Sequence, residues 1–366
     1  MKKTMIIIAC FCFLTVLLPG SSYSCGSFRV TADDGSIIAA RSMEFSVDLK
    51  YDIIVVPKDI AFESPAPDGK KGLKWKTMLG YVGVAAFGMD HGTSDGMNEK
   101  GLAMSLLWYE NDMKWQSVGP RETSMALAQT YLTDWVLGNF STVDEVKKNI
   151  QNVRVFSYVD TDIKMSLPSH FIIYDAFGGS IVIEYDNGVC NVYDNPLGIM
   201  TNAPNFPWQM TNLRQYIGMK TENPSSPMIQ GKSVPPTGHG AGMIGLPGDY
   251  TPPSRFVRFY VLTRYADRQP DAKGNLNLAQ HIINTFDIPQ GIITDIQPDG
   301  KTVLKELTQW VTFKDLTNRN FYFRTYDNFN LRKVDLKALD FNAKTIKRIS
   351  MFGSPEAITD VTGQAR

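Results

Sequence analysis

The sequence predicts an α+β fold in which helices cover antiparallel sheets. Three observations support this prediction. Strand-like segments occur in three groups along the chain, a pair of helical segments separates each group from the next, and Gly and Asn turn signals join neighbouring strands. No repeat and no linker-like stretch divides the chain. We therefore expect a leader at residues 1–24 and one domain at residues 25–366.

The leader has the pattern of a signal peptide. Lys2 and Lys3 form a short positive segment, residues 5–18 are almost wholly apolar, and small residues precede Ser24. Cleavage after Ser24 makes Cys25 the first residue of the mature protein. We therefore expect a periplasmic or secreted protein.

Charge and composition argue against several classes of partner. The chain has 37 Lys and Arg residues and 37 Asp and Glu residues, so we expect no nucleic-acid or anionic-membrane partner. No apolar run after the leader approaches the ~18 residues of a membrane helix, so we expect no stable membrane insertion after processing. The four histidines form no metal-spaced pair and no cofactor motif is present, so we expect neither a metal nor a cofactor. His170 opens a predicted strand and is interpreted as structural.

A predicted hairpin follows Cys25, with a turn at residues 33–35 between two strands. If the second strand pairs antiparallel with the first, its far end, which carries Arg41 and Glu44, lies beside Cys25. A cation lowers the pKa of a thiol, and a carboxylate can orient an α-ammonium group. A plain surface ion pair is the commoner role of two such residues.

The periods of the apolar residues predict the remaining elements. Further strands are predicted at residues 52–56, 80–87, 102–108, 170–175, 180–186, 189–193, 304–313, 321–326 and 331–334. Helices are predicted at 120–138, from Thr142 behind a Ser141-x-x-Asp144 capping signal, at 253–267 and at 276–286. Asn187-Gly188 is a strong hairpin signal. Residues 220–253 are rich in Pro, Gly and Ser and show no period, which predicts a long loop.

Cys25 has several interpretations. As a nucleophile it combines a thiol with an α-amine, whose ordinary pKa of ~7.7–8.0 suits a base at neutral pH. It could instead pair with Cys190, the other cysteine left after the leader. It could anchor a non-catalytic lipoprotein, although Ser22 stands where lipoprotein processing prefers an aliphatic residue. It could also be an ordinary terminal residue.

Five separated segments resemble the choloylglycine hydrolase family, which includes bile salt hydrolases and penicillin V acylases. They are Cys25-Gly26, RSME at 41–44, GMNEKGL at 96–102, MTNAP at 200–204 and GLPGDYTPPSRF at 245–256. They follow the family's order over most of the chain. The resemblance implies an N-terminal nucleophile hydrolase, in which two antiparallel sheets lie between helical layers in a four-layer αββα sandwich.

The resemblance also implies site roles. Cys25 attacks an amide carbonyl while its own α-amine carries the proton, giving an acyl-enzyme that water hydrolyses. Arg41 matches the arginine beside the thiol, and Arg255 matches a second active-site arginine. Asn202 matches the side chain of the oxyanion hole, whose loss in comparable sites costs about 10²–10³ in rate.

Two positions depart from the better-known family pattern. Glu44 stands where the family usually has an aspartate that holds the α-amine, so its longer side chain must sit differently. Trp108 stands where bile salt hydrolases of the Gram-positive type carry an asparagine. If this position donates through its backbone N–H, the oxyanion hole is kept with any side chain, and the tryptophan instead changes the wall of the substrate pocket. Together with the leader, Trp108 resembles the Gram-negative branch.

The expected substrate is a glycine- or taurine-conjugated bile salt; the alternatives within the class are penicillin V and acyl-homoserine lactones. We expect Met43, Phe45 and Trp108 to line the substrate pocket, together with residues 87–93 and 156–165. Their apolar area suits a sterol body. The irregular segment 209–240 matches an excursion that builds tetramers in relatives, so we expect a homotetramer.

Overall fold

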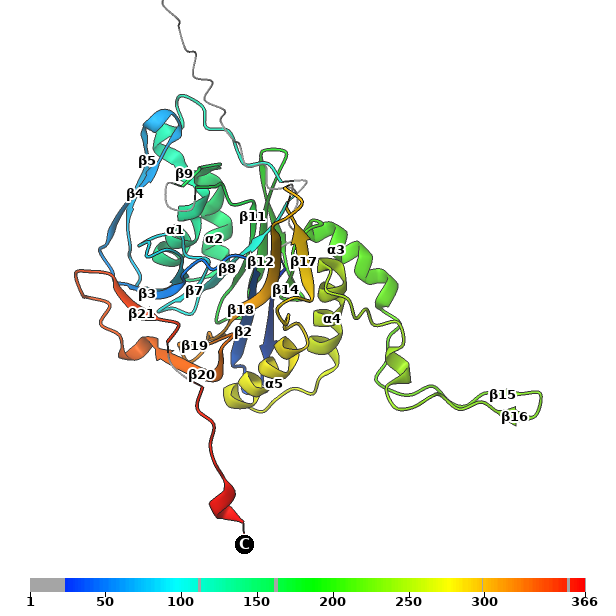
Figure 1. The fold of residues 1–366 in the computed structure, drawn as a ribbon. Coiled ribbons are helices and arrows are strands. Elements are labelled where there is room, and N and C mark those ends of the chain that lie inside the picture. The colour runs from blue at the N-terminus through cyan, green and yellow to red at the C-terminus, as the bar shows by residue number, and fades with distance from the viewer. Residues whose placement is uncertain (1–23, 111–112, 161–163, 298, 354–355, 366) are drawn as a thin grey trace, which may run out of the picture.

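The computed structural model describes residues 24–110, 113–160, 164–297, 299–353 and 356–365. The predicted leader falls almost entirely on residues 1–23, which lie outside this part of the chain. Two large antiparallel sheets face each other, and helices cover their outer faces (Figure 1). This arrangement confirms the predicted four-layer αββα sandwich.

The first sheet carries the N-terminal hairpin and has the strand order β14-β1-β2-β18-β19-β20, with β17 paired to β18. Its strands are β1 (Cys25–Thr31), β2 (Ile37–Phe45), β14 (Ile199–Met200), β17 (Ile293–Ile296), β18 (Val303–Asp315), β19 (Asn320–Thr325) and β20 (Asn328–Asp335). In the hairpin Cys25 pairs with Met43, and Ser27 pairs with Arg41. The predicted return of Arg41 and Glu44 to the start of β1 is therefore present.

The second sheet has the order β13-β12-β11-β8-β7-β6-β3-β21. Its strands are β3 (Asp52–Val56), β6 (Tyr81–Ala85), β7 (Asp95–Asn98), β8 (Ala103–Trp108), β11 (Ser169–Tyr174), β12 (Ser180–Asp186), β13 (Val189–Asp194) and β21 (Lys347–Ser350). Asn187 and Gly188 join β12 to β13 and have φ values of 53° and 79°. A type I′ hairpin turn has positive φ at both central positions, so the predicted turn is confirmed.

Helices form the two outer layers. α1 (Leu132–Asn139) and α2 (Val143–Asn149) lie on the second sheet, where α1 contacts β7 and β8. On the first sheet, α4 (Pro252–Tyr265) packs on β1 and α5 (Ala272–Asn284) packs on β2, while α3 (Phe206–Leu213) packs against α4 (Figure 1).

The helix predicted at 120–138 is wrong in its first half. Residues 123–125 form a 3-10 turn, and β9 (Ala126–Ala128) pairs in parallel with β10 (Arg154–Phe156). All three residues of β9 are buried, so pairing with a distant strand outweighs a weak local helical pattern. The cap of α2 also differs by one residue, because the side chain of Thr142, and not of Ser141, accepts the N–H of Glu145.

Two segments extend from the sandwich. β4 (Ala61–Pro65) and β5 (Lys71–Lys76) form a hairpin beside β9. The predicted loop at 220–253 includes an arm that leaves the body and ends in a small hairpin of β15 (Met228–Ile229) and β16 (Lys232–Ser233) (Figure 1). In the described part of the chain, no helix is both long and apolar enough to span a membrane.

Two hydrophobic cores hold the layers together. One fills the space between the sheets and extends under α4 and α5, and it contains Cys25. The other lies between the second sheet and the α1–α2 layer, and it contains Cys190. Both thiols are free, so the alternative in which these two cysteines form a disulfide is wrong. The physical reason is that the two side chains lie in different layers.

Candidate active site

Cys25 begins β1 and is almost fully buried, with 3% of its surface exposed. Its Sγ lies 3.9 Å from Sδ of Met43, its cross-strand partner in the β1–β2 register, and 3.9 Å from Nη2 of Arg41, which is two residues before Met43 on the same strand. The backbone N–H of Trp108, at the end of β8, also donates to this sulfur. A thiol, a guanidinium and a backbone donor therefore meet where the two sheets face each other.

Arg41 is a fully buried cation held by two contacts. Its Nη2 donates to the carbonyl oxygen of Leu106 at 2.5 Å, and its guanidinium carbon lies 4.7 Å from the centre of the Trp310 ring. A desolvated guanidinium over an aromatic face is stabilised by the ring quadrupole. The hairpin thus places a fixed positive charge beside the sulfur of Cys25.

Burial raises the pKa of the Cys25 thiol and is the largest influence on it. The charge of Arg41 opposes this shift and that of Glu44 adds to it, while the backbone N–H of Trp108 and the charge of Arg255 lower the pKa in smaller amounts. The thiol therefore holds its proton near neutral pH, since even its ordinary pKa is above 7. A base must remove that proton before the sulfur can attack.

Asn202 holds the nitrogen of Cys25. Its Oδ1 accepts the Cys25 N–H at 2.8 Å and Nη2 of Arg255 at 2.7 Å, while its Nδ2 donates to the carbonyl oxygen of Trp108 at 2.7 Å. Both partners of Oδ1 can only donate and a carbonyl can only accept, so the orientation of the amide is fixed. In this chain the Cys25 nitrogen belongs to the peptide bond with Ser24, and it occupies the place of the α-amine expected after cleavage.

Arg255 contacts Cys25 from the first turn of α4. Its Nη1 donates to the carbonyl oxygen of Cys25 at 2.6 Å, and its Nε donates to the carbonyl of Tyr250 at 2.9 Å. The side chain is 2% exposed. Arg255 therefore joins Cys25 and Asn202, which lie 177 positions apart in the sequence, into one rigid unit.

Two buried carboxyl groups lie close to this unit. Glu44 accepts from Oγ1 of Thr308 at 3.1 Å. Burial raises its pKa to about 8, against the lowering effect of Arg255. Glu306 on β18 accepts the N–H of Ser24 at 2.6 Å, and burial raises its pKa too. The structure places Glu44 near the cluster, but the N–H of Cys25 points to Asn202 and not to Glu44.

Glu306 was not predicted from the sequence. It lies in a strand-like segment without a motif, and its contact with Ser24 spans 282 residues. Only the pairing of β18 with β2 brings it to the start of β1. Its side chain is 4% exposed and holds the residue before Cys25.

A narrow cavity opens beside the sulfur of Cys25. Its volume is about 60 Å³, and Met43, Phe45 and Trp108 line it as expected, together with Phe87 and other residues of the 87–93 loop. Phe156 does not line it, because this ring packs with Ala126 and Ala128 in a separate small cluster. Of the predicted segment 156–165, residues 161–163 lie outside the described part of the chain.

His170 supports the loop that carries Asn202. Its ring nitrogens lie 2.9 Å from the carbonyl oxygen of Thr201 and 3.1 Å from Oε1 of Glu184, and Tyr109 stacks on the ring at 4.6 Å. Glu184 also accepts the N–H of Phe206 at the start of α3. His170 therefore has the structural role expected from the sequence. It holds Thr201, the residue directly before Asn202. Across the described residues, no group of three or more His, Cys, Asp or Glu side chains could hold a metal ion.

Comparisons with known proteins match most of the chain to one family. Residues 25–349 match the family of linear amide C–N hydrolases described as the choloylglycine hydrolase family. The chain is 30% identical over 329 residues to a bile salt hydrolase/transferase of Clostridium perfringens, a match that covers 88% of this chain and 95% of that protein. It is 28% identical over 350 residues to a penicillin V acylase of Pectobacterium atrosepticum, covering 90% and 84% of the two chains.

A solved structure has the same fold. The crystal structure of a variant of the conjugated bile acid hydrolase from Clostridium perfringens superposes with a TM-score of 0.81 and 26% identity, and the match covers 92% of this chain and all of the other.

Proposed function

The chain belongs to the choloylglycine hydrolase family, whose members hydrolyse linear amide C–N bonds, and from this premise we propose that it cleaves conjugated bile salts with Cys25 as nucleophile. One observation carries the proposal. The nitrogen of Cys25 is held by Asn202, its carbonyl is held by Arg255, and its sulfur faces an apolar cavity. Such an arrangement presents a base and a nucleophile from one residue.

The proposed reaction begins after residues 1–24 have been removed. The α-amine of Cys25 takes the thiol proton, and the sulfur attacks the amide carbonyl carbon, so that a C–S bond forms and the carbonyl oxygen becomes an oxyanion. The amine then donates the proton to the leaving nitrogen, and the C–N bond breaks to release glycine or taurine. Water, deprotonated by the same amine, cleaves the thioester and releases the acid.

Two donors are available for the oxyanion. The first is the backbone N–H of Trp108, which already points at the sulfur of Cys25. Because it belongs to the backbone, it can donate to the oxyanion whatever side chain stands at this position. Nδ2 of Asn202 donates to the carbonyl of Trp108 in this state, so it must leave that carbonyl to bind an oxyanion. Preorganised donors of this kind are typically the largest electrostatic contribution to acyl transfer.

The bile salt assignment is supported by the apolar wall of Met43 and Phe45 and by the similar hydrolase of Clostridium perfringens. A cavity of about 60 Å³ is much smaller than the ~300–1,000 Å³ of typical ligand pockets. Binding of a sterol body therefore requires the wall, above all the 87–93 loop, to move outward. Penicillin V is the second candidate. Its acyl group is smaller and flatter, which suits a narrow cavity lined by the ring of Trp108. An acyl-homoserine lactone is a third.

The substrate test is a comparison of kcat/KM on one preparation of the mature protein. The panel contains glycine- and taurine-conjugated bile salts, penicillin V and a long-chain acyl-homoserine lactone. If penicillin V or the lactone is preferred by tenfold or more, about 1.4 kcal/mol of transition-state preference, the bile salt assignment is wrong while the Cys25 mechanism survives.

The nucleophile test uses two buried cysteines. Cys25→Ala should lower hydrolysis by several orders of magnitude, while Cys190→Ala, in the other core, should keep it. Adding one residue before Cys25 should leave the fold intact and remove activity, because the nitrogen is then no longer a free amine. Full activity of either the Cys25→Ala variant or the extended variant would contradict the mechanism.

We further propose that the protein is periplasmic or secreted and begins at Cys25. A lipid on Cys25 is disfavoured by the 3% exposure of this residue and the small cavity at its sulfur. The intact mass of the mature protein tests both statements. A mass that starts at a free Cys25 supports the enzyme, and a lipid adduct with a blocked amine supports the lipoprotein.

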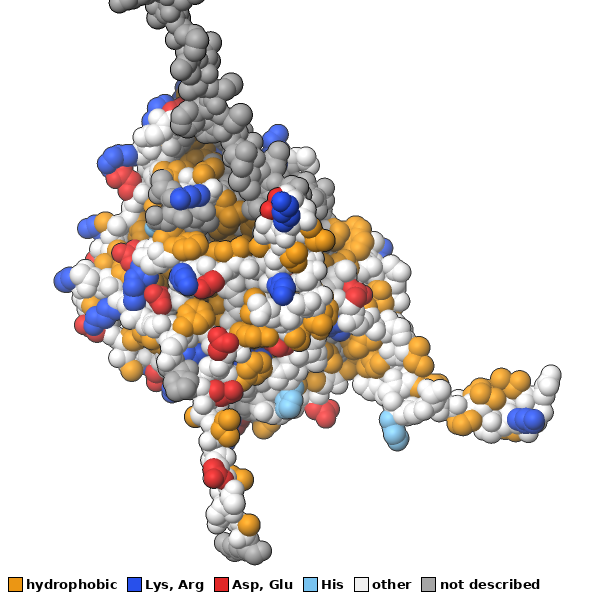
Figure 2. Space-filling model, in the orientation of Figure 1, with side chains coloured by type: hydrophobic (Ala, Val, Ile, Leu, Met, Phe, Trp, Pro, Cys, Tyr) orange, Lys and Arg blue, Asp and Glu red, His pale blue; other side chains and the backbone are white. Residues whose placement is uncertain are grey.

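We also propose a homotetramer. The protruding arm exposes Met228, Ile229 and Val234 by 65%, 56% and 46%, and Figure 2 shows apolar side chains along it. Because these apolar side chains are exposed on an arm that extends away from the sandwich, the arm is suited to pack on another subunit.

A further inference from the structure

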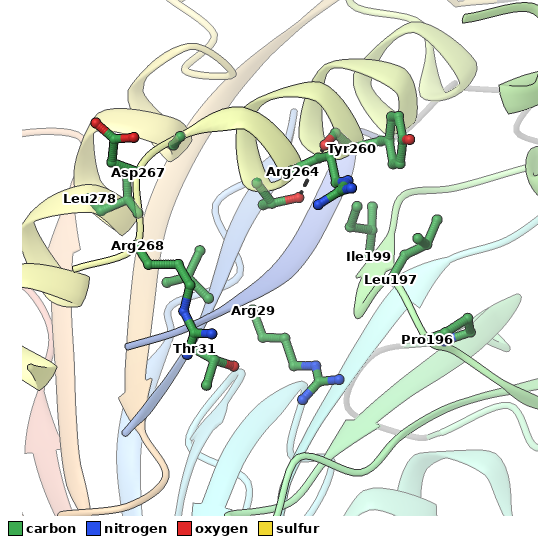
Figure 3. Close-up of a pocket in the computed structure, with 13 residues that line it drawn as sticks. Arg29, Thr31, Pro196, Leu197, Ile199, Tyr260, Arg264, Asp267, Arg268 and Leu278 are labelled. Atoms are coloured by element: carbon green, nitrogen blue, oxygen red, sulfur yellow. Dashed lines mark hydrogen bonds between the residues drawn. The ribbon is translucent and has the colours of Figure 1, made fainter. Parts of the chain in front are cut away.

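A second and larger cavity lies on the first sheet, away from the sulfur of Cys25. It is bounded by the second half of β1, the loop before β14 and the end of α4, and its volume is about 510 Å³ (Figure 3). No residue lines both this cavity and the one beside Cys25. The site described above therefore gives it no role.

Three arginines reach this cavity from three different sides. Figure 3 shows Arg264 on α4, Arg268 on the segment after that helix and Arg29 on β1. Arg268 is paired within the chain, since it lies 3.2 Å from Oδ1 of Asp33 and donates to the carbonyl of Ala32. Among the described residues, the guanidinium groups of Arg29 and Arg264 have no hydrogen-bond or ion-pair partner.

The acidic groups near the cavity do not neutralise these two cations. Asp175 acts on Arg29 from beyond ion-pair distance, and both its carboxylate oxygens already accept backbone N–H groups. Asp267 also lines the cavity, but Figure 3 places it at the opposite end from Arg29. With Arg268 paired to Asp33, Arg29 and Arg264 face one lining carboxylate, Asp267, which leaves an excess of positive charge.

Arg29 is partly buried, and this burial lowers its pKa. A desolvated guanidinium without a counterion costs free energy, which a bound anion would offset. Arginine is also well suited to carboxylate, sulfonate and phosphate groups, because its planar fork can donate two parallel hydrogen bonds.

Apolar side chains form part of the remaining wall, alongside Thr31 and Thr263. Leu197, Ile199, Leu278 and the ring of Tyr260 line the cavity between the arginines. A simple inorganic ion would leave this surface exposed to water. An organic anion with a short hydrocarbon body would cover it, at ~25 cal/mol per Å² of buried apolar area.

We propose that this cavity binds a small amphipathic organic anion, with its acidic head on Arg29 or Arg264 and its apolar body on Leu197 and Tyr260. The inference goes beyond the proposed amide hydrolysis and does not depend on it. The carboxylate, sulfonate and phosphate head groups share the chemistry that a guanidinium recognises, so the experiment compares them directly.

The test is isothermal titration calorimetry of the mature protein with octanoate, octane-1-sulfonate, octyl phosphate, inorganic phosphate and uncharged octanol. We expect Kd values of about 1 mM or tighter for at least one of the three organic anions, with an affinity that falls as salt screens the charges. We expect at least tenfold weaker binding of phosphate and octanol. If none of the organic anions binds, or if phosphate or octanol binds equally well, the proposal is overturned.

Variants locate the binding site. Arg29→Gln and Arg264→Gln should each weaken binding, one of them by about tenfold or more, because each loses a charge-assisted hydrogen-bond donor. Arg29→Lys should keep part of the affinity, and Arg121→Gln, which removes another exposed arginine, should keep all of it. Arg264 is exposed on α4, so its variant tests the site even if Arg29→Gln fails to fold.

Binding unaffected by both glutamine variants would place the anion elsewhere, for example beside Cys25, and would overturn the proposal. The experiment measures the heat of anion binding and not amide hydrolysis. A failure of the anion-binding proposal can therefore be distinguished from a failure of the proposed hydrolase activity.

Discussion

The raised pKa of Glu44 predicts how stability depends on pH in a chain that still carries Ser24. In the unfolded chain a glutamate titrates near its ordinary pKa of about 4.3–4.5, whereas burial raises the pKa of folded Glu44 to about 8. Between these values the folded protein holds one proton more than the unfolded chain. The contribution of Glu44 to stability is therefore fully present at low pH and is lost as pH rises toward 8.

The size of this effect follows from proton linkage. A difference of one bound proton changes the free energy of unfolding by about 1.4 kcal/mol per pH unit. From pH 5.5 to 7.5 the Glu44 carboxyl should therefore cost about 2–3 kcal/mol of stability. Glu44→Gln removes the titrating group, so the stability of the variant relative to the unaltered chain should rise by that amount over the same range.

Urea unfolding at several pH values measures the difference in the free energy of unfolding between Glu44→Gln and the unaltered chain. The chain should retain residues 20–24, because the structure describes the Cys25 nitrogen as part of a peptide bond. Glu222→Gln removes an exposed carboxyl on the arm and should show no such relative rise. Parallel pH profiles for Glu44→Gln and the unaltered chain would refute the reasoning. A repeat with protein that begins at Cys25 should give a smaller slope, since an α-ammonium group nearby lowers the pKa of a carboxyl.

Three further predictions concern the nucleophile, the packing and the assembly. Asn202→Ala should lower kcat by about 10²–10³ with a smaller change in KM, because the variant loses the side chain that holds the Cys25 nitrogen and can serve the oxyanion; an unchanged kcat at saturating substrate would contradict that role. Gly26→Ala should destabilise the fold by about 1–3 kcal/mol in urea unfolding, since the added Cβ would lie 2.7 Å from the ring of Phe259; equal stability would show that the ring yields freely. Deletion of residues 222–236 should lower the molar mass measured by light scattering from a tetramer to a smaller species, and an unchanged mass would point to another interface.

Local pattern predicted the part of the site that lies on one hairpin. Alternation and the turn at residues 33–35 set the register of β1 and β2, and that register alone brings Arg41 and Met43 to Cys25. The turn at Asn187-Gly188 is determined in the same local way, since both residues need positive φ. Such features depend only on neighbours in the sequence.

Features created by distant contacts could not be predicted in this way. β9 forms because buried residues 126–128 pair with β10, although the surrounding sequence is weakly helical. Glu306 reaches Ser24 only through the pairing of β18 with β2. The resemblance to the family supplied Asn202 and Arg255, which no spacing argument would have connected to Cys25.

The charges around the Cys25 nitrogen explain why cleavage would complete this site. Before cleavage, two buried carboxyl groups, Glu44 and Glu306, share one buried guanidinium, Arg255, and burial raises the pKa of both carboxyls. An uncharged peptide nitrogen at Cys25 gives them no further cation. Removal of Ser24 would free Glu306 from the N–H that it now accepts and would place an α-ammonium group among these residues. The carboxylates of Glu44 and Glu306 would then face two cations, Arg255 and the α-ammonium group of Cys25. Each buried charge in the site would therefore have a partner of opposite sign.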